Sequence, residues 1–237
     1  MKRAKLSMMW NNKKNIWGSR SMTVVKIDGP RQAPADGTAK QLVILVHGYG
    51  ADGNDLIGLA PYLARVLPNA AFAAPNGPER CDMSPMGYQW FPISQFDSSS
   101  RLTGVQSAAP ILDQFIDEEL ASHGLSEENL VLVGFSQGTM MSLHVALRRE
   151  RQIAGILGYS GLLAGPELLA EQAISKPPIL LIHGDMDEML PVQNLHEAVA
   201  ALGGAGFDVQ WHVSPGAGHT IAQDGLELGM DFLGQLF

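Results

Sequence analysis

The sequence contains a serine in a setting that can activate it as a nucleophile. Residues 134–138 read Gly-Phe-Ser-Gln-Gly; they follow a short apolar run at 129–133 and precede a helix-like stretch at 139–147. A strand, a sharp Gly-x-Ser-x-Gly turn and a helix make a nucleophile elbow, which exposes the serine hydroxyl beyond the sheet. The flanking glycines lack the side chains that would clash in this strained turn. We therefore predict catalysis by Ser136 rather than a plain strand-to-helix turn.

The chain also offers a base for this serine. Serine is a poor nucleophile at its ordinary pKa, so it needs an adjacent base, and a carboxylate must orient that base. In open α/β sheets such residues gather in loops beyond the carboxyl ends of strands. Two later loops qualify, at residues 183–191 and 215–219. His219 is the best placed of the seven histidines, because the others lie in helices, a turn, a strand or at strand ends.

Three carboxylates in the first of these loops are candidates for the orienting acid. Asp185 has the alternative of hydrogen-bonding loop backbone N–H groups and shaping the turn. Asp187 lies further from the strand end, and the longer side chain of Glu188 suits a solvated position. His183 with the two aspartates also suggests a metal site, but no second histidine–carboxylate cluster completes it. We predict neither a metal ion nor a cofactor.

Attack on an acyl carbon creates an oxyanion, which needs preorganised N–H donors. One donor is the backbone N–H of the residue after the nucleophile, Gln137. The second is expected from the loop His47-Gly48-Tyr49-Gly50, where we assign the backbone N–H of Tyr49. The glycines of this loop fit an ordinary strand-to-helix turn equally well.

Apolar runs that alternate with amphipathic segments must position these residues. Continuous apolar runs such as 41–46 are typical of strands buried on both faces of a parallel sheet. Strands are expected at 23–27 (an edge strand), 41–46, 70–74, 129–133, 153–158, 178–182 and 207–213. Helices are expected after residue 53 and at 105–123, 139–147, 166–172, 192–202 and 221–236. This alternation predicts a doubly wound, mostly parallel α/β sheet flanked by helices.

Residues 75–104 show no clear periodicity, although they contain Tyr88, Trp90, Phe91 and Phe96. A loop of this length is usually functional or mobile, but a surface meander whose aromatic side chains enter the core is an equal alternative. The segment is too short for a large lid domain. Methionines such as Met140, which follows the nucleophile, can fill irregular apolar gaps, so we expect Met140 to bind substrate.

Composition excludes several classes of protein. A chain of 237 residues suits one domain with a substantial core, and its net charge of -8 argues against nucleic-acid binding. The single cysteine, Cys81, excludes an internal disulfide framework and favours a reducing, cytoplasmic location. No apolar run approaches the roughly 20 residues of a membrane span.

Residues 1–21 differ from the rest, because they carry six basic residues and no acidic one. They lack an apolar h-region and a small-residue cleavage site, so a secretory signal is not expected. Met22 is a candidate natural start. We interpret 1–21 as a basic extension that is disordered or non-native, and 22–237 as the folded domain.

Taken together, these motifs resemble the phospholipase/carboxylesterase family. This α/β-hydrolase group contains bacterial carboxylesterases and the acyl-protein thioesterases. The similarity runs from about residue 22 to the C-terminus and rests on five motifs: residues 45–50, 87–91, 134–138, 183–187 with Pro191, and 216–219. It implies an α/β-hydrolase fold and a triad of Ser136, Asp187 and His219. It also implies a site roofed partly by the Trp90 loop, so that Trp90 is expected to bind substrate. Asp187 fits the family-like Asp-x-x-x-Pro pattern.

The predicted activity is that of a serine carboxylesterase, which hydrolyses small-molecule esters with short-to-medium acyl chains through an acyl-enzyme. An acyl thioesterase or lysophospholipase is the alternative, since the same catalytic parts serve all three. A non-catalytic binding protein of this fold is less favoured, because such proteins typically lose a triad member. The oligomeric state is not readable from the sequence, and a homodimer remains open.

Overall fold

The computed structural model describes residues 25–35, 37–93 and 97–237, and its centre is a seven-stranded sheet. The strand order is β1-β3-β2-β6-β7-β8-β9, and all neighbours are parallel except β1 and β3. These strands are β1 Arg31–Gln32, β2 Gln41–Val46, β3 Ala70–Ala73, β6 Leu130–Phe135, β7 Gly155–Tyr159, β8 Ile179–Gly184 and β9 Val209–Ser214. The predicted mostly parallel α/β sheet is thus confirmed.

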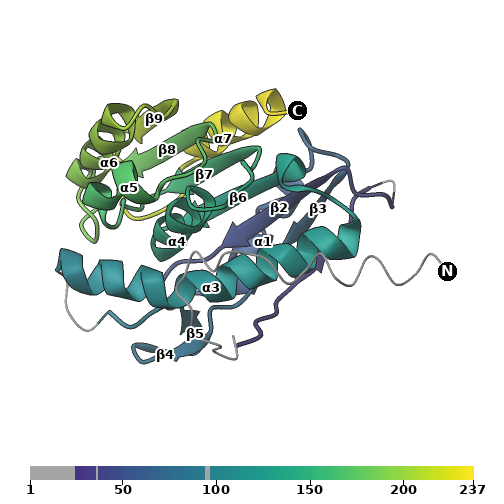
Figure 1. Cartoon of the computed structure of the whole chain (residues 1–237), viewed down its shortest axis with the longest axis horizontal. Coiled ribbons are helices and arrows are strands. Elements are labelled where there is room, and N and C mark those ends of the chain that lie inside the picture. The colour runs from purple at the N-terminus through teal and green to yellow at the C-terminus, as the bar shows by residue number, and fades with distance from the viewer. Residues whose placement is uncertain (1–24, 36, 94–96) are drawn as a thin grey trace.

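Helices cover both faces of the sheet (Figure 1). The α-helices are α1 Gly53–Ile57, α2 Ala60–Leu63, α3 Ser98–His123, α4 Gln137–Ala146, α5 Leu169–Gln172, α6 Gln193–Gly204 and α7 Gln223–Gln235. Short 3-10 helices occur at Glu127–Asn129 and Pro166–Leu168. One face packs against α3, α4 and α6, and the other against α1, α2 and α7. None of the helices in the described residues combines the length and apolar character that crossing a membrane requires.

Alternation along the central strands divides the core into two clusters. In β2, Leu42 and Ile44 belong to the cluster under α3 and α4, whereas Val43 and Leu45 belong to the cluster on the opposite face. All four side chains are fully buried. This two-sided burial explains why the strand reads as a continuous apolar run.

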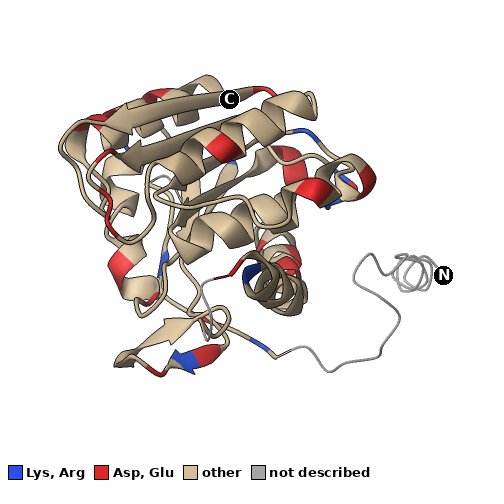
Figure 2. Ribbon diagram, turned by 90° about the vertical axis from the view of Figure 1, so that its left-hand side faces the viewer, with Lys and Arg blue, Asp and Glu red and all other residues tan. Residues whose placement is uncertain are grey.

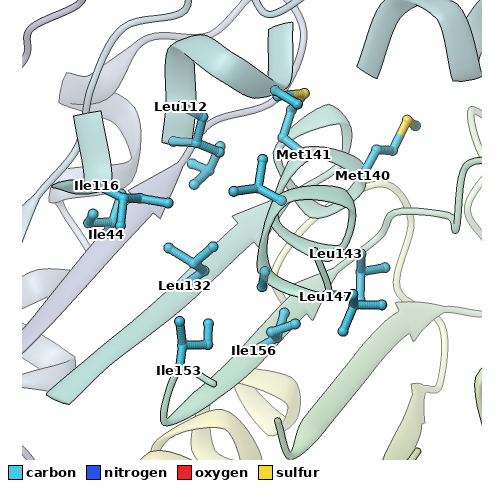
Figure 3. Packing of buried hydrophobic residues seen from close by; sticks show 14 of the residues in the cluster. Ile44, Leu112, Ile116, Leu132, Met140, Met141, Leu143, Leu147, Ile153 and Ile156 are labelled. Carbon is cyan, nitrogen blue, oxygen red and sulfur yellow. The ribbon is translucent and has the colours of Figure 1, made fainter. Parts of the chain in front are cut away.

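Packing on one face fixes the start of α4. Figure 3 shows Ile44, Leu132 and Ile156 of three adjacent strands in one cluster with Leu112 of α3 and Leu143 of α4. Burying each such side chain contributes about 1.5–3 kcal/mol. The first residue of α4 directly follows Ser136, so this packing also fixes the position of the predicted nucleophile.

The edge strand differs from the prediction. Residues 25–30 have no regular secondary structure, and residues 23 and 24 lie outside the described part of the chain. The edge strand is instead β1, which pairs with β3. Just before it, the carbonyls of Asp28 and Pro30 accept from Asn76 and Ala74, each at 3.0 Å. Pro30 has no N–H to donate, which limits regular pairing to the two residues after it.

The segment without periodicity contains unexpected elements. Strands β4 Glu79–Cys81 and β5 Ser84–Gln89 form an antiparallel hairpin that Figures 1 and 2 place apart from the main sheet. Helix α3 begins at Ser98 rather than near 105, because Asp97 caps it by accepting from the N–H groups of Ser99 and Ser100, both at 2.9 Å. The first turn is polar, so apolar periodicity alone misses it.

Candidate active site

Ser136 lies at a strained turn between β6 and α4. Its backbone has φ 54° and ψ -116°, and its N–H donates to the Tyr159 carbonyl at 2.9 Å. Such a φ in a non-glycine residue is costly and persists only where surrounding contacts enforce it. At Gly138 a Cβ atom would lie 1.8 Å from the Val46 carbonyl oxygen. The second glycine of the motif therefore lets α4 approach the end of β2.

The three predicted triad side chains meet in the structure. The Oγ atom of Ser136 lies 3.0 Å from Nε2 of His219, and Nδ1 of His219 lies 2.7 Å from Oδ2 of Asp187. The Phe135 ring contacts the imidazole, with ring centroids 5.0 Å apart. A carboxylate at Nδ1 requires a proton there, so Nε2 is left as the acceptor for the serine hydroxyl.

Asp187 is buried and is held by three hydrogen bonds, from two backbone N–H groups and from His219. Its Oδ1 accepts from the backbone N–H groups of Met189 at 3.0 Å and Leu190 at 2.8 Å. Its Oδ2 lies 3.2 Å from Nε2 of His183 as well as next to His219. The side chain has no exposed surface, and a buried carboxylate needs such complete pairing. Nε2 of His183 also lies 2.7 Å from the Leu190 carbonyl oxygen, so His183 helps to fix the loop that carries Asp187.

The other two carboxylates of this loop are exposed. Asp185 accepts from the backbone N–H of Gly216 at 2.6 Å. Gly216 has φ 70° and lies in the turn that carries His219. This contact agrees with the loop-shaping role considered for Asp185. It joins the loop at 183–191 to the loop at 215–219, which carries His219.

The two segments that carry the predicted oxyanion donors both adjoin Ser136. A Cβ atom on Gly48 would be 3.2 Å from Cβ of Ser136, so the loop after β2 passes directly beside the nucleophile. Gln137 is the first residue of α4, so its backbone N–H lies at the helix N-terminus, where the helix itself supplies no acceptor.

The two residues expected to bind substrate lie in the core. Trp90 is 1% exposed and its indole N–H donates to the His47 carbonyl at 3.0 Å. Met140 is 5% exposed and packs in the cluster of Figure 3. These two predictions need correction, because neither side chain presents a surface to substrate. Trp90 and Phe91 instead fit the alternative interpretation of residues 75–104, in which aromatic side chains of a surface segment enter the core. Phe96 lies outside the described residues.

A pocket of about 290 Å³ lies between the start of α3, residues 162–167 and α6, and none of the three triad residues lines it. Its lining is mixed, with apolar side chains such as Leu102 and Leu162 and the charged side chains of Arg101, Glu167 and Glu197. The segment 162–167 begins beside the nucleophile, since a Cβ atom on Gly161 would lie 3.0 Å from the Ser136 carbonyl oxygen. Among the described residues, no group of three or more His, Cys, Asp or Glu side chains is arranged to hold a metal ion.

Known proteins are similar to this chain in sequence and in fold. The profile of the family described as Phospholipase/Carboxylesterase matches residues 30–236. The crystal structure of esterase PE8 is 44% identical, has a TM-score of 0.87 and covers 90% of this chain and 100% of its own. Acyl-protein thioesterase 1 of Gibberella zeae is 30% identical over 84% of this chain and 91% of that protein. Esterase YpfH of Escherichia coli K12 is 28% identical over 85% of each chain.

The profile match covers most of the chain, and the sheet, the elbow serine and the flanking helices form one connected structure. On this evidence, the chain belongs to the phospholipase/carboxylesterase family and has the α/β-hydrolase fold.

Proposed function

We propose that this carboxylic-ester hydrolase uses Ser136 as its nucleophile, His219 as general base and Asp187 as the orienting acid. The observation that carries the proposal is the continuous set of contacts from Ser136 Oγ through both ring nitrogens of His219 to Asp187, at 3.0 and 2.7 Å. The strained backbone of Ser136 supports it, because strain of this kind clusters at active sites.

In the proposed reaction, the Ser136 hydroxyl proton moves to Nε2 of His219 while Oγ forms a bond to the ester carbon. The backbone N–H groups of Tyr49 and Gln137 stabilise the resulting oxyanion. The bond to the alcohol oxygen then breaks, and the alcohol leaves with the proton from Nε2. Water repeats these steps on the acyl-enzyme, and Asp187 stays ionised throughout and stabilises the imidazolium.

The substrate class we propose is an ester with a short-to-medium acyl chain. The pocket of about 290 Å³ beside residues 162–167 has a partly apolar lining and limited volume, which suits a chain of this size. The single cysteine, Cys81, is free and buried, and this composition supports a cytoplasmic location.

An acyl thioesterase is the second candidate. It is supported by the relative from Gibberella zeae, whose name is acyl-protein thioesterase 1. The proposed catalytic groups would serve a thioester equally well, since attack on the carbonyl carbon and stabilisation of the oxyanion are common to both reactions.

A panel of oxygen esters and thioesters with increasing acyl length tests the proposal. We expect the highest kcat/KM on soluble short-to-medium oxygen esters, with no increase in rate at a lipid interface. Higher rates on thioesters of long chains would favour the thioesterase, and higher rates on triglyceride emulsions than on soluble esters would overturn the proposed substrate class.

A further inference from the structure

The two segments that carry the proposed oxyanion donors are joined by buried hydrogen bonds through Trp90. The side chain of Gln137 accepts from the Trp90 backbone N–H at 2.8 Å and donates to the Phe91 carbonyl at 2.9 Å. The indole N–H of Trp90 in turn donates to the His47 carbonyl at 3.0 Å. One residue, Trp90, thus contacts both the start of α4 and the loop after β2.

His47 fixes the loop on its own side. Its Nε2 accepts from the backbone N–H of Gly77 at 2.8 Å, and Nδ1 lies 2.7 Å from the Gly48 carbonyl. Burial lowers the pKa of His47, so the ring is neutral, with the acceptor at Nε2 and the proton at Nδ1. The ring thus contacts the Gly48 carbonyl, directly before Tyr49, and ties this loop to the segment after β3 through Gly77.

The separation of the two donors is the quantity that these contacts control. Tyr49 and Gln137 belong to different elements, and an oxyanion is stabilised only when both N–H groups lie about 2.7–3.1 Å from it. Displacements of about 1 Å in an active site can cost on the order of a hundredfold in rate. The side chains of Gln137 and Trp90 are each 1% exposed, so water does not substitute for the hydrogen bonds they make.

We propose that the Gln137 side chain and the Trp90 indole are positioning residues, which hold the two oxyanion donors at the separation that the transition state requires. The inference rests on the proposed function. It assigns Gln137 a side-chain role that is separate from its backbone N–H, and it explains why a tryptophan in the core matters for catalysis without contacting substrate.

The test uses Gln137→Met and Trp90→Phe, which remove hydrogen-bonding groups but keep apolar bulk and leave every backbone N–H in place. Gln210→Met and Trp211→Phe on β9 are matched controls, because both residues are exposed. Each variant is assayed on a p-nitrophenyl ester and on its thiono analogue, which has C=S in place of C=O. Sulfur accepts hydrogen bonds weakly, so the thiono substrate depends less on the donors.

We expect Gln137→Met and Trp90→Phe each to lower kcat on the ester by about 10- to 100-fold. This loss is no larger than the loss of rate that follows removal of one oxyanion donor. KM should change by less than about threefold, and the ratio of ester to thionoester turnover should fall at least about tenfold, whereas both controls keep the wild-type ratio. Covalent labelling of Ser136 by an organophosphonate and thermal unfolding report on whether each variant is folded. If Gln137→Met does not fold, Trp90→Phe decides alone.

Equal losses on both substrates, or a lower melting temperature with an unchanged ratio, would show that the contacts serve stability only and would overturn the inference. Failure of the proposed function would give a different result from failure of this inference. A wild-type protein that hydrolyses no ester, or a Ser136→Ala variant that remains active, would overturn the function itself.

Discussion

The carboxylate of Asp187 lies 2.7 Å from Nδ1 of His219, and the Asp187 side chain has no exposed surface. Asp187→Asn should therefore leave the imidazole in the wrong tautomer and lower turnover by about 10⁴-fold. Asp185→Asn is the matched control on the same loop. It should keep most of the turnover and lose only about 0.5–1.5 kcal/mol of stability, because the Asp185 carboxylate is exposed and an amide oxygen can still accept from Gly216.

Measuring turnover and urea unfolding for the two variants side by side decides between the carboxylates. Asp185→Asn with lost turnover and intact stability, together with an active Asp187→Asn, would mean that the acid is wrongly assigned.

Ser136→Ala should abolish ester hydrolysis while the fold is retained, because loss of the triad serine typically costs on the order of a million-fold in turnover. Labelling by an organophosphonate should disappear in the same variant, as mass spectrometry of the intact protein can show. Persistent labelling with persistent activity would place the nucleophile elsewhere.

Gly138→Ala should damage the elbow, because its Cβ atom would lie 1.8 Å from the Val46 carbonyl oxygen. Gly203→Ala on α6 is a matched control, since no atom lies within 4 Å of its added Cβ. We expect thermal unfolding to show a marked loss of stability for the first variant and a gain of about 0.4–1 kcal/mol for the second. An active Gly138→Ala of wild-type stability would contradict the packing described for the elbow.

We expect the buried His144 to make the folded protein less stable at acidic pH. Burial lowers its pKa to about 3, and the charge of Arg148 adds to this effect. Between the unfolded value of 6.5 and this value, the unfolded chain binds a proton that folded His144 does not. The free energy of unfolding should fall as the pH drops through this window, by roughly 1.4 kcal/mol per pH unit from this group.

His144→Leu should flatten this dependence, and urea unfolding at several pH values between about 4 and 7 measures it. The buried His47, whose pKa is also lowered, should keep part of the slope in the variant. An unchanged slope in His144→Leu would show that the group does not contribute.

Removal of residues 1–21, which lie outside the described part of the chain, should leave melting temperature and activity close to the full-length values. The reason is that this segment has no apolar periodicity and carries charge of one sign only. Calorimetry and ester assays of the two lengths make the comparison. A drop of more than about 5 °C, roughly 1–2 kcal/mol for a domain of this size, would show that the segment packs on the domain or on a second chain.

Local pattern was sufficient for the elements that are buried on both sides. The run at 41–46 became β2 with the same bounds, because a strand between two layers of helices must be apolar wherever it is fully buried, here at 42–46. The Gly-x-Ser-x-Gly turn was equally readable, since only a strand-to-helix turn with close backbone contacts needs glycines at both flanks. Family resemblance added Asp187 to a loop in which residue types alone left three carboxylates open.

Elements without an apolar period of their own were not readable. The polar first turn of α3 depends on the local cap at Asp97, and the two residues of β1 depend on β3, about 40 positions away. Trp90 could be assigned equally to a roof or to the core until its indole was seen to meet His47, 43 positions away. The hydrogen-bond donors of Asp187 and the contacts of the Gln137 side chain likewise could not be predicted from the sequence pattern.

Thus the sequence alone determined the order of the buried parallel strands and the main helices, the elbow and the residue types of the site, because these follow from periodicity and backbone sterics. The folded chain decided which carboxylate meets His219, where the aromatic side chains lie and how the two oxyanion segments are joined. Those choices depend on burial and on hydrogen bonds between residues tens of positions apart, for which a linear pattern carries no signal.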